Sequence, residues 1–473
     1  MSLILQKTFP PGPKRRYPGE FLLKLMQNPL GFLSELNATH GPVVGMKLGK
    51  RRIVTVQQPE LIHQVLVTDA ASYIKGRGLE VAKRLLGEGL LTSEGQLHKQ
   101  QRQLLQSVFQ ARKVEQFAPT VQACSERLLG GWPEQGVISA SPEMTRLTLQ
   151  IVGESLFGSN LENDVAEVRS AMDEVVEVFR VCSLPFYELG EKLFPPLKRR
   201  PQQVRARLDA VVGRMISEHR ACPHQDLLGR MVEACESSKI DDNLLRDEAM
   251  TLFLAGHETT AHALTFALYL LSRHPAEQES ARQELLEVIG DGRVEARHIE
   301  QLPFLKAVLL ETLRLYPTAW MIGRRSTRET DLGEYSFPAD CTVLMSPYVV
   351  HRDPTNFPEP ERFWPLRWQL RPRGSLPKLC YFPFGGGPRV CIGEHFAWQE
   401  MMLGLGTILQ TYRLGLCPVE HPKLRTGITL APGEPLPIPV ERLSGASKGL
   451  PRADRQGARP GGDVPPEAVW STV

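Results

Sequence analysis

The sequence predicts one mostly helical domain with a small β portion. Three observations indicate this fold class. Apolar residues recur at helical spacing over most of the 473-residue chain. The segment 242–273 reads as one uninterrupted helix, which at about 1.5 Å per residue would be roughly 48 Å long and would cross a domain of this size. Strand-like alternation is confined to short segments, and 42% hydrophobic with 23% charged residues is typical of a globular protein with a large core.

The N-terminal part is predicted to hold a lead-in, a helix and a hairpin. Residues 1–19 form a proline-rich lead-in. A helical pattern follows at Phe21–Leu36. Val43–Leu48 and Arg51–Val56 alternate around a Gly-Lys turn and predict a β-hairpin.

Helical periodicity continues from residue 59 to about 190. The segment Tyr73–Gly95, rich in glycine and charge, is expected to be a long loop. Gln202–Arg220 and Ala276–Ile289 are predicted to be amphipathic helices.

The C-terminal part is predicted to contain the remaining strands and an irregular run. Strand-like alternation returns at Leu332–Met345 and near Leu424–Ile438. Residues 353–389, rich in proline and glycine, are expected to be mostly irregular. Residues 444–473 have few large apolar side chains and predict a disordered tail, which leaves 1–443 as the domain.

Composition excludes several classes of function. A formal net charge of +3 is too small to indicate nucleic-acid binding. Eight scattered cysteines without a C-x-x-C pair argue against a zinc ribbon or disulfide scaffold and fit a reducing cytoplasm. The N-terminal apolar run is too short for a signal peptide or anchor. The apolar stretch Thr251–Leu271 has His257 and Glu258 near its middle, which predicts a buried helix and not a membrane span. We expect a soluble cytoplasmic monomer with at most peripheral membrane contact.

One glycine-rich turn carries the main functional signal. In Phe384–Gly393, Cys391 lies just before the predicted helix 394–403, so the helix N-terminus should favour a thiolate suited to a soft metal. A buried structural cysteine is the alternative. The pattern F-x-x-G-x-R-x-C-x-G, carried by Phe384, Gly387, Arg389, Cys391 and Gly393, resembles the haem-binding signature of the cytochrome P-450 family, the haem-thiolate monooxygenases. The resemblance covers about residues 9–440 and implies a helix-rich prism around haem b, with Cys391 as the axial ligand of the iron.

The long helix contains a second motif at its centre. Gly256 in a helix interior costs about 1 kcal/mol relative to Ala, so small residues there indicate room for a ligand. Ala255-Gly256-His257-Glu258-Thr259 resembles the family's A/G-G-x-D/E-T motif. The resemblance implies that Thr259 stabilises bound dioxygen and that Glu258 supplies protons for O–O cleavage. The alternative is a core threonine beside a solvated glutamate.

The segment from His257 to His262 is similar to the H-E-x-x-H motif of a zinc-peptidase helix. The two histidines are five residues apart, about 140° around a helix, so they cannot share a metal, and we expect both to be ordinary packing residues.

An E-x-x-R helix predicts a structural ion pair. Glu311 and Arg314 lie at i and i+3 among leucines. The family resemblance implies a third member, an arginine before the cysteine loop. The string Pro-Glu-Arg-Phe offers Arg362, but alignment on F-P-x-P-x-x-F-x-P-x-R selects Arg367.

The resemblance also implies cations for the two haem propionates. His98 and Arg102, at i and i+4, share a helix face. Arg324 follows the E-x-x-R helix, with Arg325 as a register alternative, and Arg389 comes from the cysteine loop. Each alone could be a solvated surface charge.

Substrate and partners are the least specific inferences. The resemblance places a mostly apolar pocket at Phe253, Trp320, Met321, Ile322 and Ile428, although these side chains could equally be core. The string 314–320 is similar to carotenoid-hydroxylating and fatty-acid-hydroxylating members, so the expected substrate is a carotenoid or other isoprenoid, and next a long-chain fatty acid.

No flavin or dinucleotide fingerprint is present, so electrons are expected from a separate ferredoxin with its reductase, or from a flavodoxin. A basic face could dock it: Lys99, Arg112, Lys113, Arg371 and Arg373. The alternatives are a haem-thiolate peroxygenase or isomerase, which commonly lacks the acid–threonine pair, a non-enzymatic haem carrier, and a zinc hydrolase.

Overall fold

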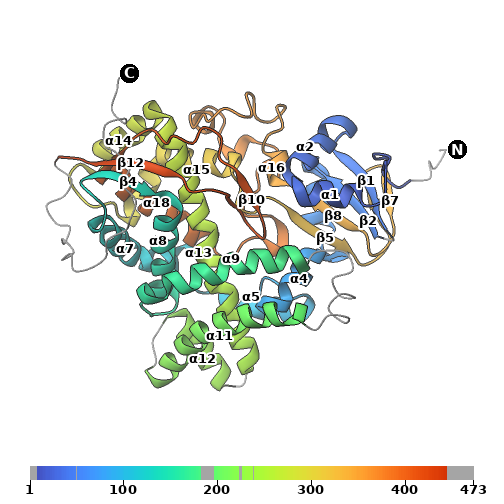
Figure 1. The fold of residues 1–473 in the computed structure, drawn as a ribbon, viewed down its shortest axis with the longest axis horizontal. Helices are drawn as coiled ribbons and strands as arrows, with labels where there is room; N and C mark the ends of the chain where they lie inside the picture. The colour runs from blue at the N-terminus through green and yellow to red at the C-terminus, as the bar shows by residue number, and fades with distance from the viewer. Residues whose placement is uncertain (1–7, 50, 183–195, 223–225, 238, 445–473) are drawn as a thin grey trace.

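A computed structural model describes residues 8–49, 51–182, 196–222, 226–237 and 239–444. Helices make up most of the described chain (Figure 1). They are α1 (Glu20–Gln27), α2 (Pro29–His40), α3 (Pro59–His63), α4 (Arg77–Leu86), α5 (Gly95–Gln106), α6 (Ala111–Val114), α7 (Ala118–Gly130), α8 (Ala140–Leu156), α9 (Val165–Cys182), α11 (Pro196–Ala221), α12 (Leu227–Glu236), α13 (Asp242–Arg273), α14 (Pro275–Ile289), α15 (Pro303–Leu315), α16 (Pro347–Val350), α17 (Arg367–Leu370) and α18 (Glu394–Thr411).

The strands are short and form small sheets. They are β1 (Val43–Leu48), β2 (Arg51–Val56), β3 (Tyr73–Lys75), β4 (Gln135–Ser139), β5 (Ile322–Ser326), β6 (Thr330–Leu332), β7 (Tyr335–Phe337), β8 (Thr342–Met345), β9 (Tyr412–Leu414), β10 (Leu424–Thr426), β11 (Leu430–Pro432) and β12 (Pro437–Arg442). The largest sheet has the order β1-β2-β8-β5-β3, in which only the β2–β8 pair is parallel. A second sheet joins β4, β12 and β9, and β6–β7 and β10–β11 are hairpins. The predicted hairpin of β1 and β2 is confirmed with the predicted bounds.

The helix α13 runs through the helical part of the molecule and has the bounds predicted from the sequence (Figure 1). It begins because the side chain of Asp241 accepts a hydrogen bond from the N–H of Leu244, which satisfies one of the free donors of the first turn. It packs along α8 and also contacts α11, α15 and α18. Almost every residue from Leu245 to Ser272 is buried, so this helix positions whatever its few accessible residues touch.

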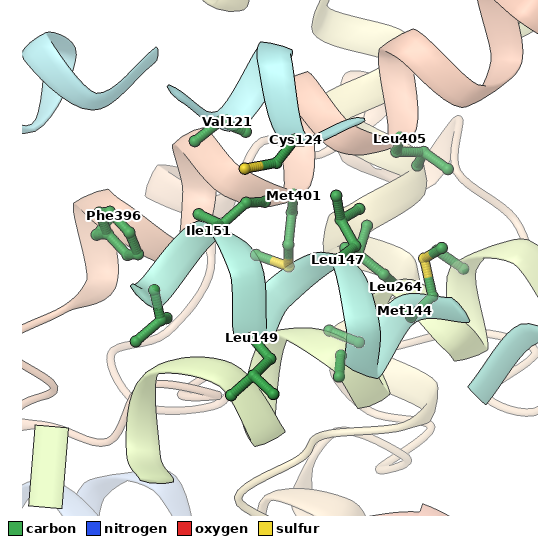
Figure 2. Close-up of a cluster of buried hydrophobic side chains, with 14 of the residues drawn as sticks. Val121, Cys124, Met144, Leu147, Leu149, Ile151, Leu264, Phe396, Met401 and Leu405 are labelled. Carbon is green, nitrogen blue, oxygen red and sulfur yellow. The ribbon is translucent and has the colours of Figure 1, made fainter. Parts of the chain in front are cut away.

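Helices α7, α8, α13 and α18 meet in the main core. Figure 2 shows side chains from each of them interdigitating, among them Cys124, Leu147, Leu264 and Met401. These residues are 2% exposed or less. The site elements α13 and α18 are therefore fixed against each other by packed apolar side chains.

Several sequence expectations were wrong in their local structure. The segment Tyr73–Gly95 is not a long loop, because it contains β3 and α4. The single helix expected at Phe21–Leu36 is two helices, since Asn28 ends α1 and its side chain caps α2 by accepting from the N–H of Gly31. Strands β4 and β9 were missed, because each is defined by pairing with the distant β12.

The other elements agree with expectation. The amphipathic helices lie within α11 and α14, and residues 353–389 contain only short turns of helix. The expected disordered tail lies, apart from residue 444, outside the described residues. Within the part of the chain that the structure describes, no helix is long and apolar enough to cross a membrane.

Candidate active site

The cysteine loop is a tight turn that only glycine allows at two places. Gly385 and Gly387 have φ of +77° and +69°. A Cβ added to Gly387 would lie 1.8 Å from the carbonyl oxygen of Leu66, so the loop rests directly on the backbone of a neighbouring segment. The N–H of Cys391 donates to the carbonyl oxygen of Phe384 at 2.9 Å, which closes the turn. The loop thus holds Cys391 ahead of α18 in a fixed position.

Burial governs the ionisation of the Cys391 thiol. Its surroundings raise the pKa of Cys391 to about 11, although the N–H of Gly393 and the charge of Arg102 act in the opposite direction. The start of α18 favours a thiolate as expected, since the N–H of Gly393 lowers the pKa, but desolvation outweighs this effect. The residue nevertheless has accessible surface. Coordination by a metal cation is what would deprotonate such a thiol.

The centre of α13 has one exposed residue, with half-buried Gly256, Glu258 and Thr259 beside it. Ala255 is exposed although Thr251 to Leu254 are buried. The hydroxyl of Thr259 donates to the carbonyl oxygen of Ala255 at 2.9 Å, so this threonine sits one turn along the same face.

The missing side chain of Gly256 does not leave room for a ligand on the face of α13 that holds Ala255 and Thr259. A Cβ added there would lie 3.1 Å from Cγ2 of Val152, so its missing side chain lets α13 approach α8. The structure gives Gly256 a helix-packing role, and the cofactor contact expected for it stays a prediction.

Glu258 has two polar neighbours. The hydroxyl of Thr429, just before β11, donates to Oε1 of Glu258 at 2.8 Å, and Nε2 of His262 lies 3.6 Å from the same oxygen. Burial by itself would raise the pKa of Glu258, but His262 and Thr429 hold that pKa below its usual value. Glu258 is therefore a carboxylate at neutral pH.

The two histidines of α13 have different surroundings. His257 packs as expected: Nδ1 donates to the carbonyl oxygen of Phe253 at 2.7 Å, and the ring lies against the Phe253 ring. His262 is not an ordinary packing residue, because it lies beside the Glu258 carboxylate.

The predicted ion-pair triad forms in full. Nε and Nη2 of Arg314 donate to the two oxygens of Glu311 at 2.8 and 2.9 Å, and Nε of Arg367 donates to Oε1 at 2.9 Å. Glu311 and Arg314 are fully buried. Arg314 also donates to the carbonyl oxygens of His351 and Pro360, which ties the irregular run to α15. The alternative Arg362 is exposed and pairs with Glu359 at 3.2 Å.

Two buried cations face each other across β3 and β5. Lys75 and Arg324 are direct cross-strand partners, and each is 6% exposed. Like charges in that position repel. Burial, with the charge of Arg389, lowers the pKa of Arg324 to about 10, and burial lowers the pKa of Lys75 to about 8. Among the described residues, Arg324 has no ion pair; its Nη1 donates only to the carbonyl oxygen of Gly323.

The same cluster includes the other expected cations. Burial, together with the charges of Lys75 and Arg389, lowers the pKa of His98 to about 4. Arg102 donates to the carbonyl oxygen of Val390 at 2.9 Å. Arg389 pairs with Glu94 at 2.8 Å, so it is already partly neutralised.

The directions of the Arg324 and Arg325 side chains distinguish the two candidates for the propionate contact. Arg325 points outward and pairs with Asp340 and Glu80. Arg324 is the inward member of the pair.

Sequence reasoning missed Lys75, whose Nζ donates to the carbonyl oxygens of Leu90 and Ser93. Alternation in Tyr73-Ile74-Lys75 was the available signal, since it puts Lys75 on the same side of a strand as buried Tyr73.

The expected substrate residues divide into two groups. Phe253 is fully buried against Phe157, with ring centroids 6.0 Å apart, and is core. Trp320 packs with the N-terminal helices and donates to the carbonyl oxygen of Gly427 at 3.1 Å, so it is core as well. Met321, Ile322 and Ile428 keep accessible surface.

Two of these accessible residues are adjacent to the site elements. A Cβ added to Gly385 of the cysteine loop would lie 3.6 Å from Cδ1 of Ile322. Ile428 precedes Thr429, the partner of Glu258.

The five residues of the expected basic face are exposed. Lys113 and Arg112 lie on α6, which packs against α18. Arg373 pairs with Glu394 at the start of α18, and Arg371 donates to the carbonyl oxygen of Asn356.

The residues present fit a haem. An accessible thiol with a burial-raised pKa suits an iron ligand. The excess of buried positive charge around Lys75 and Arg324 suits a dianionic group such as two propionates.

Comparison with known proteins gives one family. The family model described as "Cytochrome P450" matches residues 10–436. Cyclooctatin synthase from Streptomyces melanosporofaciens is 35% identical over 428 residues, which are 89% of this chain and 93% of that protein. Cyclooctat-9-en-7-ol 5-monooxygenase from the same organism is 33% identical over 408 residues, covering 84% and 87%. Pentalenene oxygenase from Streptomyces avermitilis is 31% identical over 433 residues, covering 87% and 95%.

Proposed function

Because this chain belongs to the cytochrome P450 family and is a haem monooxygenase of that family, we propose that it hydroxylates an isoprenoid hydrocarbon or alcohol. The observation that carries the proposal is the similarity to oxygenases named for cyclooctat-9-en-7-ol and pentalenene over most of both chains. Accessible Ile322 and Ile428, next to the cysteine loop and to the partner of Glu258, offer apolar contacts for such a molecule.

When bound, the haem supplies the activation of dioxygen by iron. In this proposal Cys391 holds the iron, Lys75, Arg324 and Arg102 neutralise the propionates, and neutral His98 donates a hydrogen bond to one of them. Their burial makes these contacts strong, since charge-assisted bonds gain strength in a low dielectric.

Thr259 and Glu258 are proposed to handle protons. The Thr259 hydroxyl is bonded to the Ala255 carbonyl beside the accessible part of α13. The Glu258 carboxylate accepts from the Thr429 hydroxyl at 2.8 Å and lies 3.6 Å from Nε2 of His262, so a proton taken up by Glu258 has polar neighbours along which it can be passed.

The proton role is tested with two substitutions of one residue. Thr259→Ala removes the hydroxyl and should lower the yield of hydroxylated product per NAD(P)H while peroxide rises. Thr259→Ser keeps the hydroxyl and should stay close to the original enzyme. Equal product yield in all three proteins would contradict the proton role.

The substrate class is tested by titration of the ferric enzyme, with the haem spin state as the readout. Cyclic terpenes and their alcohols should displace the water ligand and shift the spin state at low concentrations. Carotenoids and long-chain fatty acids are the comparison arms. A spin shift and product with fatty acids alone would contradict the isoprenoid assignment without affecting the family assignment.

The electron donor is proposed to be a separate acidic protein, a ferredoxin or flavodoxin, that docks at the basic face. Arg112 and Lys113 are the most suitable members, because they are exposed and α6 packs on the helix that follows Cys391. The double variant Arg112→Glu/Lys113→Glu should raise the KM for the donor at low salt and leave substrate binding unchanged. Arg297→Glu, at a cation with 72% exposure outside this face, is the matched control. An unchanged KM in the double variant would refute the docking site.

A further inference from the structure

The N-terminal helix α1 exposes apolar side chains beside a run of cations. Phe21 and Leu25 face inward; the Phe21 ring stacks on that of Phe32 in α2, with centroids 6.1 Å apart. Leu23 and Met26 are 43% and 41% exposed. At about 100° per residue, Leu22, Leu23 and Met26 fall within about 100° of one another, so they share one outward face.

The residues before α1 extend this face. Tyr17 is 49% exposed and stands immediately before the turn into the helix. Figure 1 shows α1 and α2 at the edge of the molecule, beside strands β1 and β2. Leu23 and Met26 of α1 are thus on the outside of the fold and do not belong to the core clusters, unlike Phe21 and Leu25.

The charge of this segment is one-sided. Lys14, Arg15 and Arg16 are exposed, and their side chains form no ion pair with any described residue. Two carboxylates lie nearby: Glu20 is 6% exposed and accepts from the backbone N–H of Arg16, and Glu35 of α2 pairs with Lys24 at 3.4 Å. With Lys24, residues 8–27 carry four cations and one anion, a formal charge of +3 that equals that of the whole chain. The remaining sequence is balanced, and the excess is concentrated here.

We propose that this surface, made of Lys14–Tyr17 and the outward face of α1, binds an anionic lipid bilayer. Cations attract acidic headgroups, tyrosine is favoured at the membrane interface, and leucine and methionine can enter the acyl boundary. A soluble protein partner would match the cations with carboxylates, but the apolar face of α1 would then need a complementary apolar surface as well.

The contact is peripheral, since no described helix is long and apolar enough to cross a membrane. The inference goes beyond the proposed function and concerns where the enzyme sits. It does not depend on which substrate is oxidised.

The test is co-flotation of the full-length, haem-loaded protein with lipid vesicles. One set contains phosphatidylcholine with phosphatidylglycerol, and the other contains phosphatidylcholine alone. The protein should float with the anionic vesicles at low salt and much less with the neutral ones. High salt should release it, because screening weakens the attraction of surface charges.

Three variants separate the contributions. Lys14→Glu/Arg15→Glu/Arg16→Glu should lower the partition coefficient on anionic vesicles by more than about 100-fold, since loss of each cation near the surface contributes about fivefold and the three new carboxylates add repulsion. Leu23→Ser/Met26→Ser should lower it about tenfold, the expected loss for two partly inserted apolar side chains. Leu370→Ser/Leu416→Ser is the matched control, because these leucines are 74% and 62% exposed elsewhere and should not matter.

Failure to float with anionic vesicles would overturn the proposal. So would equal flotation of the wild type and both test variants, or an equal effect of the control variant. If charge reversal at residues 14–16 altered only the KM for the electron donor in vesicle-free solution, the surface would bind a protein and the proposal would be wrong. The variants change exposed residues, so their thiolate-haem spectra should be unchanged and serve as the folding control.

Discussion

Arg367 and Arg362 stand five residues apart in the same irregular run, and only one of them should matter for stability. The changes to compare are Arg367→Ala and Arg362→Ala. Arg367 is 6% exposed and donates to Glu311 at 2.9 Å and to the carbonyl oxygens of Pro358 and Glu359 at 2.8 and 3.2 Å. Arg362 contributes an exposed pair with Glu359, and its carbonyl oxygen, which accepts from Arg314, is kept in the alanine variant.

The magnitude follows from these contacts. Losing a bond to a buried carboxylate costs about 1.5–3 kcal/mol, and each carbonyl left without its donor adds about 1 kcal/mol. Arg367→Ala should therefore lower the free energy of unfolding by about 3–5 kcal/mol. Arg362→Ala should lower it by less than about 1 kcal/mol, since exposed ion pairs contribute little.

The assay is urea denaturation followed by tryptophan fluorescence, with haem content measured on the same samples. Arg367→Lys should recover only part of the loss, because an ammonium cannot reproduce the forked geometry of a guanidinium. If the two alanine variants lost the same stability within about 1 kcal/mol, or if Arg362→Ala lost more, the assignment of the triad would be refuted.

Further predictions concern pH, haem retention and the cysteine loop. Glu248 is fully buried, and burial raises its pKa to about 7. Neutral Glu248 therefore contributes fully to the free energy of unfolding below about pH 4.5. This contribution, about 3 kcal/mol, is lost as the pH rises to about 7. Glu248→Gln should remove that slope in the free energy of unfolding measured from pH 5 to 8; an unchanged slope would contradict it. Arg324→Leu should speed haem loss to apomyoglobin about 10- to 100-fold, whereas Arg325→Leu should change it less than about twofold, and equal rates would contradict the inward role of Arg324. Gly387→Ala should cost about 3 kcal/mol in thermal unfolding, from the positive φ and the clash with Leu66, and an unchanged Tm would refute the close approach.

The sequence was most informative where structure is local. The bounds of α13 followed from its apolar pattern, and the hairpin of β1 and β2 followed from alternation around a glycine turn. The third member of the triad was predictable through the family resemblance, because alignment on the family's proline and aromatic pattern selects Arg367.

What could not be predicted depends on contacts between distant segments. A three-residue strand such as β3 forms because β5 pairs with it, and the three residues contain no signal for a partner about 250 positions away in the sequence. The sequence of a helix that is buried on all sides also does not indicate which neighbour each side chain faces. Phe253 and Gly256 belong to the predicted motif region, yet both face α8 or its end and not the accessible part of α13.

The central claim is that Cys391 is the thiolate ligand of a haem iron, and one spectrum tests it most directly. The dithionite-reduced, CO-bound protein should show the red-shifted Soret band typical of thiolate-ligated haem, and Cys391→Ala should abolish it. Cys380→Ala, at a fully buried cysteine whose pKa burial also raises to about 11, is the control and should leave the band in place. A Soret band at the position typical of histidine-ligated haem in active protein, or a thiolate band that survives Cys391→Ala, would contradict the account.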